Sequence, residues 1–474
     1  MGGDDGGMDM GDHGDGSSHG DHSTPTITPP GAGASQAEIN AYVAEVRAQG
    51  ETHPANHDTA MMNEHMAAMD LVDRSEATHI AVRDGQWDDP NTWHNGEVPG
   101  DGARALVPEG VEVDYSVVSD ASLFTVRVDG VLDFATDTDS QMIFDTMIVS
   151  PTGHLIIGTE DNPVNPDVDV DLIVADNGPI DTSWDPMLLS RGLVSHGEAT
   201  IHGAEVDSHE KVSEDPMAGD TSVSFDAAPE GWQVGDTIVI AGTEYDGHRW
   251  NNDAQAITLH PSEDEIRVIT SIEGNTVYFD EPLEHDHDTP RADLKTSVAN
   301  YTRNVSIETE NAENVEVFER GHVMFMHSDD VDVRYMEFHE LGRTDKSEDS
   351  FPIGDGTNDP TANIQGRYSL HIHRTGTADQ DNPTILEGNA VYGSPGWGIV
   401  HHDSHANLTN NATFDTFGSG IVSETGNETG LWHDNIAIYA EGISWQTPKN
   451  ASTITEDTFD IGRGGEGFLS LIHI

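Results

Sequence analysis

Gly398-Ile399-Val400, Gly420-Ile421-Val422 and Gly442-Ile443 repeat one short pattern at a spacing of 22 residues. The same period relates three segments that begin with asparagine: 389–391, 411–413 and, after 24 residues, 435–437. A repeat of roughly 20 to 25 residues, with short β-branched runs broken by Gly, Asn and Asp, is typical of a β-solenoid. We therefore predict an all-β fold in which each repeat forms one coil.

Stacked coils lie about 4.8 Å apart, so residues one period apart become neighbours. His402 is then expected beside Glu424. One coil earlier, the alternation in RYSLHIH (367–373) places His371 and His373 on one face of a strand. The period thus predicts a compact cluster of imidazoles and a carboxylate on a rigid surface.

These side chains suit the cleavage of a polysaccharide. Hydrolysis needs a general acid and a base or nucleophile, usually carboxylates, whereas elimination from a uronide needs a base and a cation that neutralises the uronate. The predicted catalytic residues are His371, His373, His401 and Glu424, with Asp415 in reserve. The predicted substrate-binding residues are Arg367, Arg374 and Glu428. Spacing and composition leave hydrolysis and elimination equally open.

The same cluster can hold a divalent metal, and the predicted ligands are His373, His402 and Glu424. Imidazole nitrogens favour zinc, manganese or iron, whereas calcium would use the oxygens of Asp- and Asn-rich loops. Metal-assisted and metal-free acid–base chemistry both remain open at this point. A third interpretation is structural, because polar side chains stacked on successive coils can form stabilising ladders.

Composition restricts the partners of this chain. Acidic residues number 87 against 20 basic ones, a net charge of −67, and there is no cysteine. Acid spread this evenly fits a halophile protein that stays hydrated in concentrated salt. The charge excludes nucleic acid as an expected partner. No apolar run reaches the ~20 residues of a membrane span, and sequons such as those at Asn407 and Asn427 favour an extracellular or cell-surface location.

The chain is expected to divide into five parts. They are a disordered Gly/Asp/His-rich leader (1–34), a helical linker (35–78), a β-domain (79–175), a β-rich connecting region with a polar insertion (176–300), and a truncated parallel β-helix (301–474). Ser35 and Glu38 have the spacing of a helix capping box. The Met/His stripe that follows predicts a packing surface more than a metal site.

A family resemblance covers about residues 79–445. The strings GQWDDPNTWHNGEVPGDGARALVPEGVEVDY (85–115), VDGVLDF (128–134) and GHLIIGTEDNP (153–163) resemble the eight-glycine domain of cell-migration-inducing and transmembrane hyaluronidases and of fibrocystin-like proteins. RYSLHIHRTG (367–376) and FGSGIVSETGNE (417–428) resemble two further hyaluronidase segments. The resemblance implies a right-handed parallel β-helix preceded by an eight-glycine domain. It departs from the pattern at Ser419, where histidine is expected, and at Thr425, where aspartate is expected.

These observations predict an extracellular polysaccharide hydrolase or lyase that acts on an extended glycan, with uronate-containing glycans among the candidate substrates. The divalent metal would be calcium, zinc or manganese. The competing hypothesis is a non-catalytic glycan-binding or adhesin module of a cell surface. A copper-handling protein built on the Met/His-rich leader is a third hypothesis. The sequence does not indicate an oligomeric state.

Overall fold

The structure is a computed structural model of the 474-residue chain. It describes residues 27–51, 59–244, 247–251, 255–352, 358–442 and 461–470. The histidines of the predicted leader, Ile443 in the third repeat and the last four residues lie outside the described residues.

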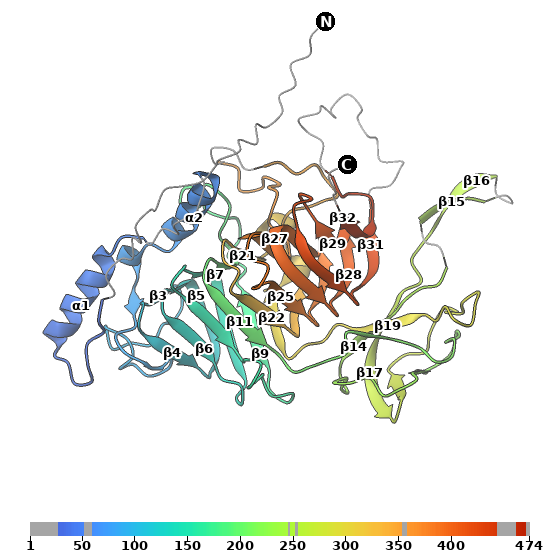
Figure 1. Cartoon of the computed structure of the whole chain (residues 1–474), viewed down its shortest axis with the longest axis horizontal. Helices are drawn as coiled ribbons and strands as arrows, with labels where there is room; N and C mark the ends of the chain where they lie inside the picture. The colour runs from blue at the N-terminus through green and yellow to red at the C-terminus, as the bar shows by residue number, and fades with distance from the viewer. Residues whose placement is uncertain are drawn as a thin grey trace, which may run out of the picture.

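Most strands stack in parallel into a β-helix whose coils have three sides (Figure 1). One row of strands carries the candidate site. It comprises β1 (His79–Ile80), β3 (Arg104–Val107), β5 (Val118–Val128), β7 (Ser140–Val149), β10 (Gly192–Ser195), β21 (His322–Met326), β24 (Leu370–Gly376), β27 (Ile399–Thr409), β29 (Ser419–Ser423) and β32 (Glu466–Ser470).

The other two rows complete each coil. The second row comprises β2 (Gly85–Gln86), β4 (Glu112–Tyr115), β6 (Val131–Phe134), β8 (His154–Ile157), β11 (Glu198–His202), β22 (Val331–Arg334), β25 (Thr384–Glu387), the end of β27 and β30 (Thr429–His433). The third row comprises the beginnings of β5 and β7, then β9 (Val170–Val174), β20 (Val305–Thr309), β23 (Met336–His339), β26 (Ala390–Ser394), β28 (Ala412–Phe417) and β31 (Ile436–Glu441).

The 22-residue period sets the register of the coils. Ile399 pairs with Ile421, and Ala390 pairs with Ala412, as the spacing predicts. The interior is filled by aliphatic and aromatic side chains, and it includes Trp87 and Trp93, which are each 2% exposed. The predicted all-β parallel helix is confirmed.

Hydrogen bonding continues across the domain boundary expected at residue 175. β7 pairs with β10, and β9 pairs with β20, so strands before and after this point belong to one stack. The chain leaves the stack after β11 and returns at β20. The intervening segment forms a six-stranded antiparallel sheet and a separate hairpin that projects from the body (Figure 1). The sheet comprises β12 (His209–Lys211), β13 (Ser222–Ser224), β14 (Thr237–Ile240), β17 (Glu265–Glu273), β18 (Thr276–Phe279) and β19 (Ser297–Asn300), and the hairpin comprises β15 (Gly247–Asn251) and β16 (Ala256–His260).

Two helices precede the β-helix, α1 (Gln36–Ala48) and α2 (Thr59–Leu71). The predicted capping box at Ser35 and Glu38 is present, and Glu38 accepts a hydrogen bond from the Ser35 backbone at 2.7 Å. α2 packs Met69 and its apolar neighbours against β21, so the methionine stripe is a packing surface as predicted. The described residues also include three short 3-10 helices: Arg74–Glu76, Ala312–Asn314 and Val317–Glu319. In the described part of the chain, no helix is long and apolar enough to cross a membrane.

Candidate functional site

The candidate site lies where three successive coils turn at the end of the first row. Met326, His373 and His402 are in register there, on β21, β24 and β27. The residue after each of them has a left-handed backbone: His327 (φ 63°), Arg374 (φ 53°) and Asp403 (φ 46°). A non-glycine residue in this region costs about 1–3 kcal/mol, and such positions cluster at functional sites.

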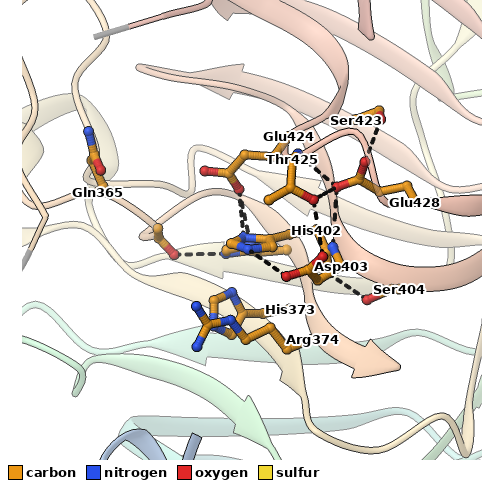
Figure 2. A network of polar contacts seen from close by, with 12 residues as sticks. Gln365, His373, Arg374, His402, Asp403, Ser404, Ser423, Glu424, Thr425 and Glu428 are labelled. Atoms are coloured by element: carbon orange, nitrogen blue, oxygen red, sulfur yellow. Dashed lines mark hydrogen bonds and ion pairs between the residues drawn. The ribbon is translucent and has the colours of Figure 1, made fainter. Parts of the chain in front are cut away.

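Three imidazoles and one carboxylate meet at this corner; Figure 2 shows His373, His402 and Glu424, and His371 lies next to them. His402 Nδ1 lies 2.9 Å from Glu424 Oε2, the coil-to-coil contact that the period predicts. His371 Nε2 lies 3.7 Å from the same oxygen. One nitrogen from each of His371, His373 and His402 lies within 4.8 Å of the others. Since His371 and His373 lie on β24, His402 lies on β27 and Glu424 directly follows β29, the rigid stack fixes these separations.

The inward-facing atoms of the cluster are not satisfied by hydrogen bonds. Within the described residues, no hydrogen-bond partner reaches His371 Nε2, His373 Nδ1, His402 Nδ1 or Glu424 Oε2, although all four atoms are buried. The 2.9 Å approach of His402 to Glu424 is an ion pair without hydrogen-bond alignment. His371 Nε2 and His373 Nδ1 each cost about 1–3 kcal/mol in this state, whereas the charges of His402 and Glu424 offset each other, and such a group of buried atoms indicates a missing ligand.

The second ring nitrogen of each of these imidazoles has a polar neighbour. His371 Nδ1 donates to the carbonyl of Gly366 at 3.0 Å, which leaves the lone pair on Nε2. His373 Nε2 donates to Glu64 at 3.3 Å, which leaves the lone pair on Nδ1. His402 Nε2 lies 3.9 Å from a carboxylate oxygen of Asp403. Metal-binding histidines are oriented by outer carbonyls and carboxylates in this way, so the residues fit a divalent metal.

The protonation of the cluster also fits a metal. Burial brings the pKa of His371 well below its ordinary value and lowers the pKa of His373 to about 3, so both are neutral at pH 7. Burial also opposes the charged forms of His402 and Glu424, but their ion pair outweighs it. The pKa of His402 is therefore raised and that of Glu424 lowered. A metal bound to His402 would compete with a proton for its nitrogen.

A cavity of about 280 Å³ lies over the cluster. One wall is apolar, made by Met187, Leu189, Met324 and Met326, and the edge carries Arg367 and Arg374. Helix α2 closes one side with Glu64 and Ala67. The cavity thus combines an apolar wall with a few convergent polar groups, the usual composition of a ligand site.

Glu64 and His327 were not predicted from the sequence. Glu64 Oε2 lies 3.2 Å from His327 Nε2 and 3.3 Å from His373 Nε2, and both Glu64 oxygens lie 3.4 Å from Arg374. No repeat period connects residue 64 with residue 373. His327 directly follows Met326, the residue in register with His373, and this alignment was the signal available for it.

His401 lies outside the cavity, in contrast to the expectation that it belongs to the catalytic group. It pairs with Ser423, as the period predicts, but its side chain is only 2% exposed. His401 Nε2 donates to the Ser404 carbonyl at 2.8 Å, and Nδ1 accepts from the indole of Trp432 at 3.3 Å. Neighbouring residues of a strand face opposite sides, so His402 and His401 cannot serve one site.

Glu428 also differs from its expected role in binding substrate. Its carboxylate accepts hydrogen bonds from the Thr425 and Gly426 backbones at 2.8 and 2.7 Å and from the Ser423 hydroxyl at 2.8 Å (Figure 2). Burial opposes its charge, yet these bonds lower its pKa to about 2. Glu428 therefore orders the loop after β29 and does not line the cavity.

The two predicted arginines have different surroundings. Arg367 is 7% exposed and donates to the carbonyls of Leu188 at 2.7 Å and Met187 at 3.0 Å, so it holds the cavity wall. Arg374 remains at the cavity edge, where Glu64 is its ion-pair partner. Asp415, the reserve carboxylate, lies on β28 in another row of strands and lines a different pocket.

Comparisons with known proteins agree with this architecture. The family model of the G8 domain matches residues 92–213, and that of the CEMIP β-helix matches residues 361–461. The chain carries a G8 domain and a CEMIP-type β-helix. All the predicted site residues lie within the second match.

The curated relatives are distant. A G8 domain-containing protein of Dictyostelium discoideum is 23% identical over 376 residues, 77% of this chain and 30% of the relative. Communication mutant protein F of the same organism is 21% identical over 367 residues, 76% of this chain and 30% of the relative. Mouse fibrocystin is 23% identical over 403 residues, 78% of this chain but 9% of fibrocystin. The chain therefore spans less than a third of these relatives.

Among solved structures, two phage tailspikes are similar to the chain. The tailspike gp49 of Pseudomonas phage LKA1 is 11% identical, with a TM-score of 0.19, and the match covers 71% of this chain and 49% of the tailspike. The Gp54 tailspike of Acinetobacter baumannii phage AP22, solved with a capsular saccharide, is 12% identical, with the same TM-score, over 68% of this chain and 47% of the tailspike. A TM-score this low does not permit a comparison of sites.

Proposed function

We propose that this chain is an extracellular polysaccharide-cleaving enzyme that works with one divalent metal ion, held by His371, His373, His402 and Glu424. The observation that carries the proposal is the set of four buried ligand atoms without hydrogen bonds at the base of a cavity. The CEMIP-type β-helix supports a glycan as the ligand. Nitrogen-rich ligands favour zinc or manganese over calcium.

The chemistry of the site follows from its residues. A divalent ion bound there supplies positive charge to an oxygen that becomes anionic in the transition state. Arg374 adds a second positive charge at the cavity edge. The methionine and leucine wall excludes water from the cluster and strengthens these electrostatic interactions. The same groups serve hydrolysis of a glycosidic bond or elimination from a uronide.

The test is depolymerisation of hyaluronan, chondroitin and microbial polyuronates in multimolar salt, because the net charge of −67 must be screened. We expect cleavage that stops with a chelator and returns when zinc or manganese is added. Glu424→Gln and His373→Ala should each lower the rate by at least about a hundredfold. Absorbance of an unsaturated product identifies elimination, and its absence with new reducing ends identifies hydrolysis.

His433→Ala is the matched control, because this exposed histidine lies on β30 in a different row of the same coils. It should leave the rate unchanged. If the folded protein binds a glycan but does not cleave it, the result would contradict the enzyme hypothesis and support the non-catalytic surface module. Cleavage that is insensitive to chelator would contradict the metal.

A further inference from the structure

Glu64 places a carboxylate from helix α2 inside the cavity edge. Its three partners are His327, His373 and Arg374, at 3.2 to 3.4 Å, and they come from two adjacent coils of the β-helix. The side chain of Glu64 is 32% exposed, so it lies at the border between the cavity and solvent. Two imidazole N–H groups and one guanidinium form the arrangement that binds a carboxylate.

Two further arginines lie near the cavity. Arg367 lines it, Arg343 is close to Arg367, and both donate to the carbonyl of Leu188, between the cavity-lining Met187 and Leu189. Asp145 and Asp185 offset part of this charge. In a chain with a net charge of −67, a cavity lined by Arg367 and Arg374 is a place that favours an anion.

The carboxylate comes from a segment that is separate from the rest of the site. α2 lies outside both family matches, whereas His373 and Arg374 belong to the CEMIP β-helix match. Its interface with the β-helix is an apolar cluster that includes Met69, Met324 and Met326. Methionine side chains adapt easily to a changed position of a partner, so this interface can tolerate a shift of the helix.

We propose that His327, His373 and Arg374 form a subsite for the carboxylate of a uronic acid residue, and that Glu64 fills this subsite when no glycan is bound. The inference rests on the proposed function, since it names the substrate class of the same site. Binding of a uronate would displace Glu64 and shift α2. The uronate carboxylate would then accept the hydrogen bond from His373 Nε2 that Glu64 accepts in the free protein.

The experiment measures binding of D-glucuronate and D-glucose by calorimetry, in molar salt, with and without manganese. The variants are Glu64→Ala and the isosteric Glu64→Gln. The control is Asp70→Asn, which removes an exposed carboxylate of the same helix. We expect glucuronate to bind about tenfold more tightly to Glu64→Ala than to the wild type, because the competing carboxylate is gone. Glu64→Gln should show a smaller gain, and Asp70→Asn none.

Glucose separates a charged subsite from a merely enlarged cavity. Its affinity should be unaffected by either Glu64 substitution. Equal gains for glucose and glucuronate, or no gain for glucuronate in either folded variant, would overturn the subsite. If the Glu64 variants bind glucuronate more tightly but no glycan is cleaved, the subsite is supported and the proposed enzyme activity is contradicted. If neutral glycans are cleaved as fast as uronates without a gain at Glu64, the enzyme stands and the subsite fails.

Discussion

Two columns of polar side chains run along the same coils of this β-helix, and they differ in what their atoms contact. In one column, Asn389, Asn411 and Asn435 follow each other on successive coils. Each amide bonds to the next: Asn389 Nδ2 donates to Asn411 at 3.0 Å, and Asn411 Nδ2 donates to Asn435 at 2.9 Å. The other, which we call the histidine column, comprises His373 and His402 in register, Glu424 on the next coil and His371 beside them, and the inward atoms of these four residues have no hydrogen-bond partner among the described residues.

This difference in hydrogen bonding distinguishes a structural column of polar residues from a functional one. In a solenoid, equivalent positions of successive repeats lie next to each other, so columns of polar residues are expected from the geometry alone. The asparagine column satisfies its atoms internally and also binds the carbonyls of Val333 and Leu386. The histidine column leaves four buried atoms facing one cavity, which lowers stability unless a ligand completes them.

The largest expected effect comes from breaking the asparagine column. Asn411→Leu removes the acceptor of the Asn389 backbone N–H and the donor to the Leu386 carbonyl, and all three residues are buried. The loss of these bonds should cost about 3–5 kcal/mol of unfolding free energy. Denaturant unfolding of metal-free protein measures it. A cost below about 1 kcal/mol would contradict a structural role for this column.

The same change in the histidine column should have a much smaller effect on stability. His371→Leu removes an unsatisfied Nε2 but leaves the Gly366 carbonyl without its donor, so the two effects offset each other. We expect the unfolding free energy of metal-free protein to change by no more than about 1 kcal/mol. Unfolding under the conditions used for Asn411→Leu provides the comparison. A loss as large as that of Asn411→Leu would make both columns structural.

Glu428 sharpens the comparison with Glu424, four residues earlier on the same loop. Its pKa is lowered to about 2 by bonds from Thr425, so its stabilising contribution is present above about pH 4.5 and is lost as the pH falls toward 2. Because the group is half exposed, Glu428→Gln should cost only about 1 kcal/mol at pH 7. The cost should shrink at pH 3. A cost that does not change with pH would indicate that Glu428→Gln disturbs packing and not that it removes a stabilising charge.

The smallest expected effect concerns stacked carboxylates in the second row. Asp133 pairs with Asp114, and burial together with Asp114 raises the pKa of Asp133 to about 6. A raised pKa favours the folded state at low pH, and this contribution is lost as the pH rises through 6. Asp133→Asn should therefore stabilise the protein at pH 8 by less than about 1 kcal/mol at low salt. Molar salt should reduce the part of the gain that comes from repulsion by Asp114 but not the part that comes from burial, and a gain that salt leaves unchanged would contradict a Coulombic contribution.

The features of the fold and of the site that follow from the repeat spacing could be predicted from the sequence. The 22-residue spacing was sufficient for the stacked coils, for His402 beside Glu424 and for the asparagine column, because each coil adds residues in fixed register. The period alone was not sufficient for His401: strand alternation places it on the face of Ile372, with which it is in register, and so opposite to His402. It could not indicate that Arg367 would hold the backbone at Leu188, because that loop has no counterpart in the repeat.

Contacts from outside the repeat were beyond prediction. Glu64 reaches His373 across 309 residues of sequence, from a helix whose pattern indicates only an apolar packing face. The segment between β11 and β20 has its own antiparallel hydrogen bonding, which follows no coil period. Both cases depend on how separate elements pack, and one-dimensional patterns do not contain that information.

The most direct test of the central claim is a metal titration of chelator-treated protein by calorimetry, with zinc and with manganese, confirmed by elemental analysis of the desalted complex. The account predicts one equivalent bound to the wild type and to Asn411→Gln. Since four ligands share the binding energy, His371→Leu or Glu424→Gln should weaken affinity by about a hundredfold. No bound metal in the folded wild type, or equal affinity in these variants, would contradict the histidine column as a metal site.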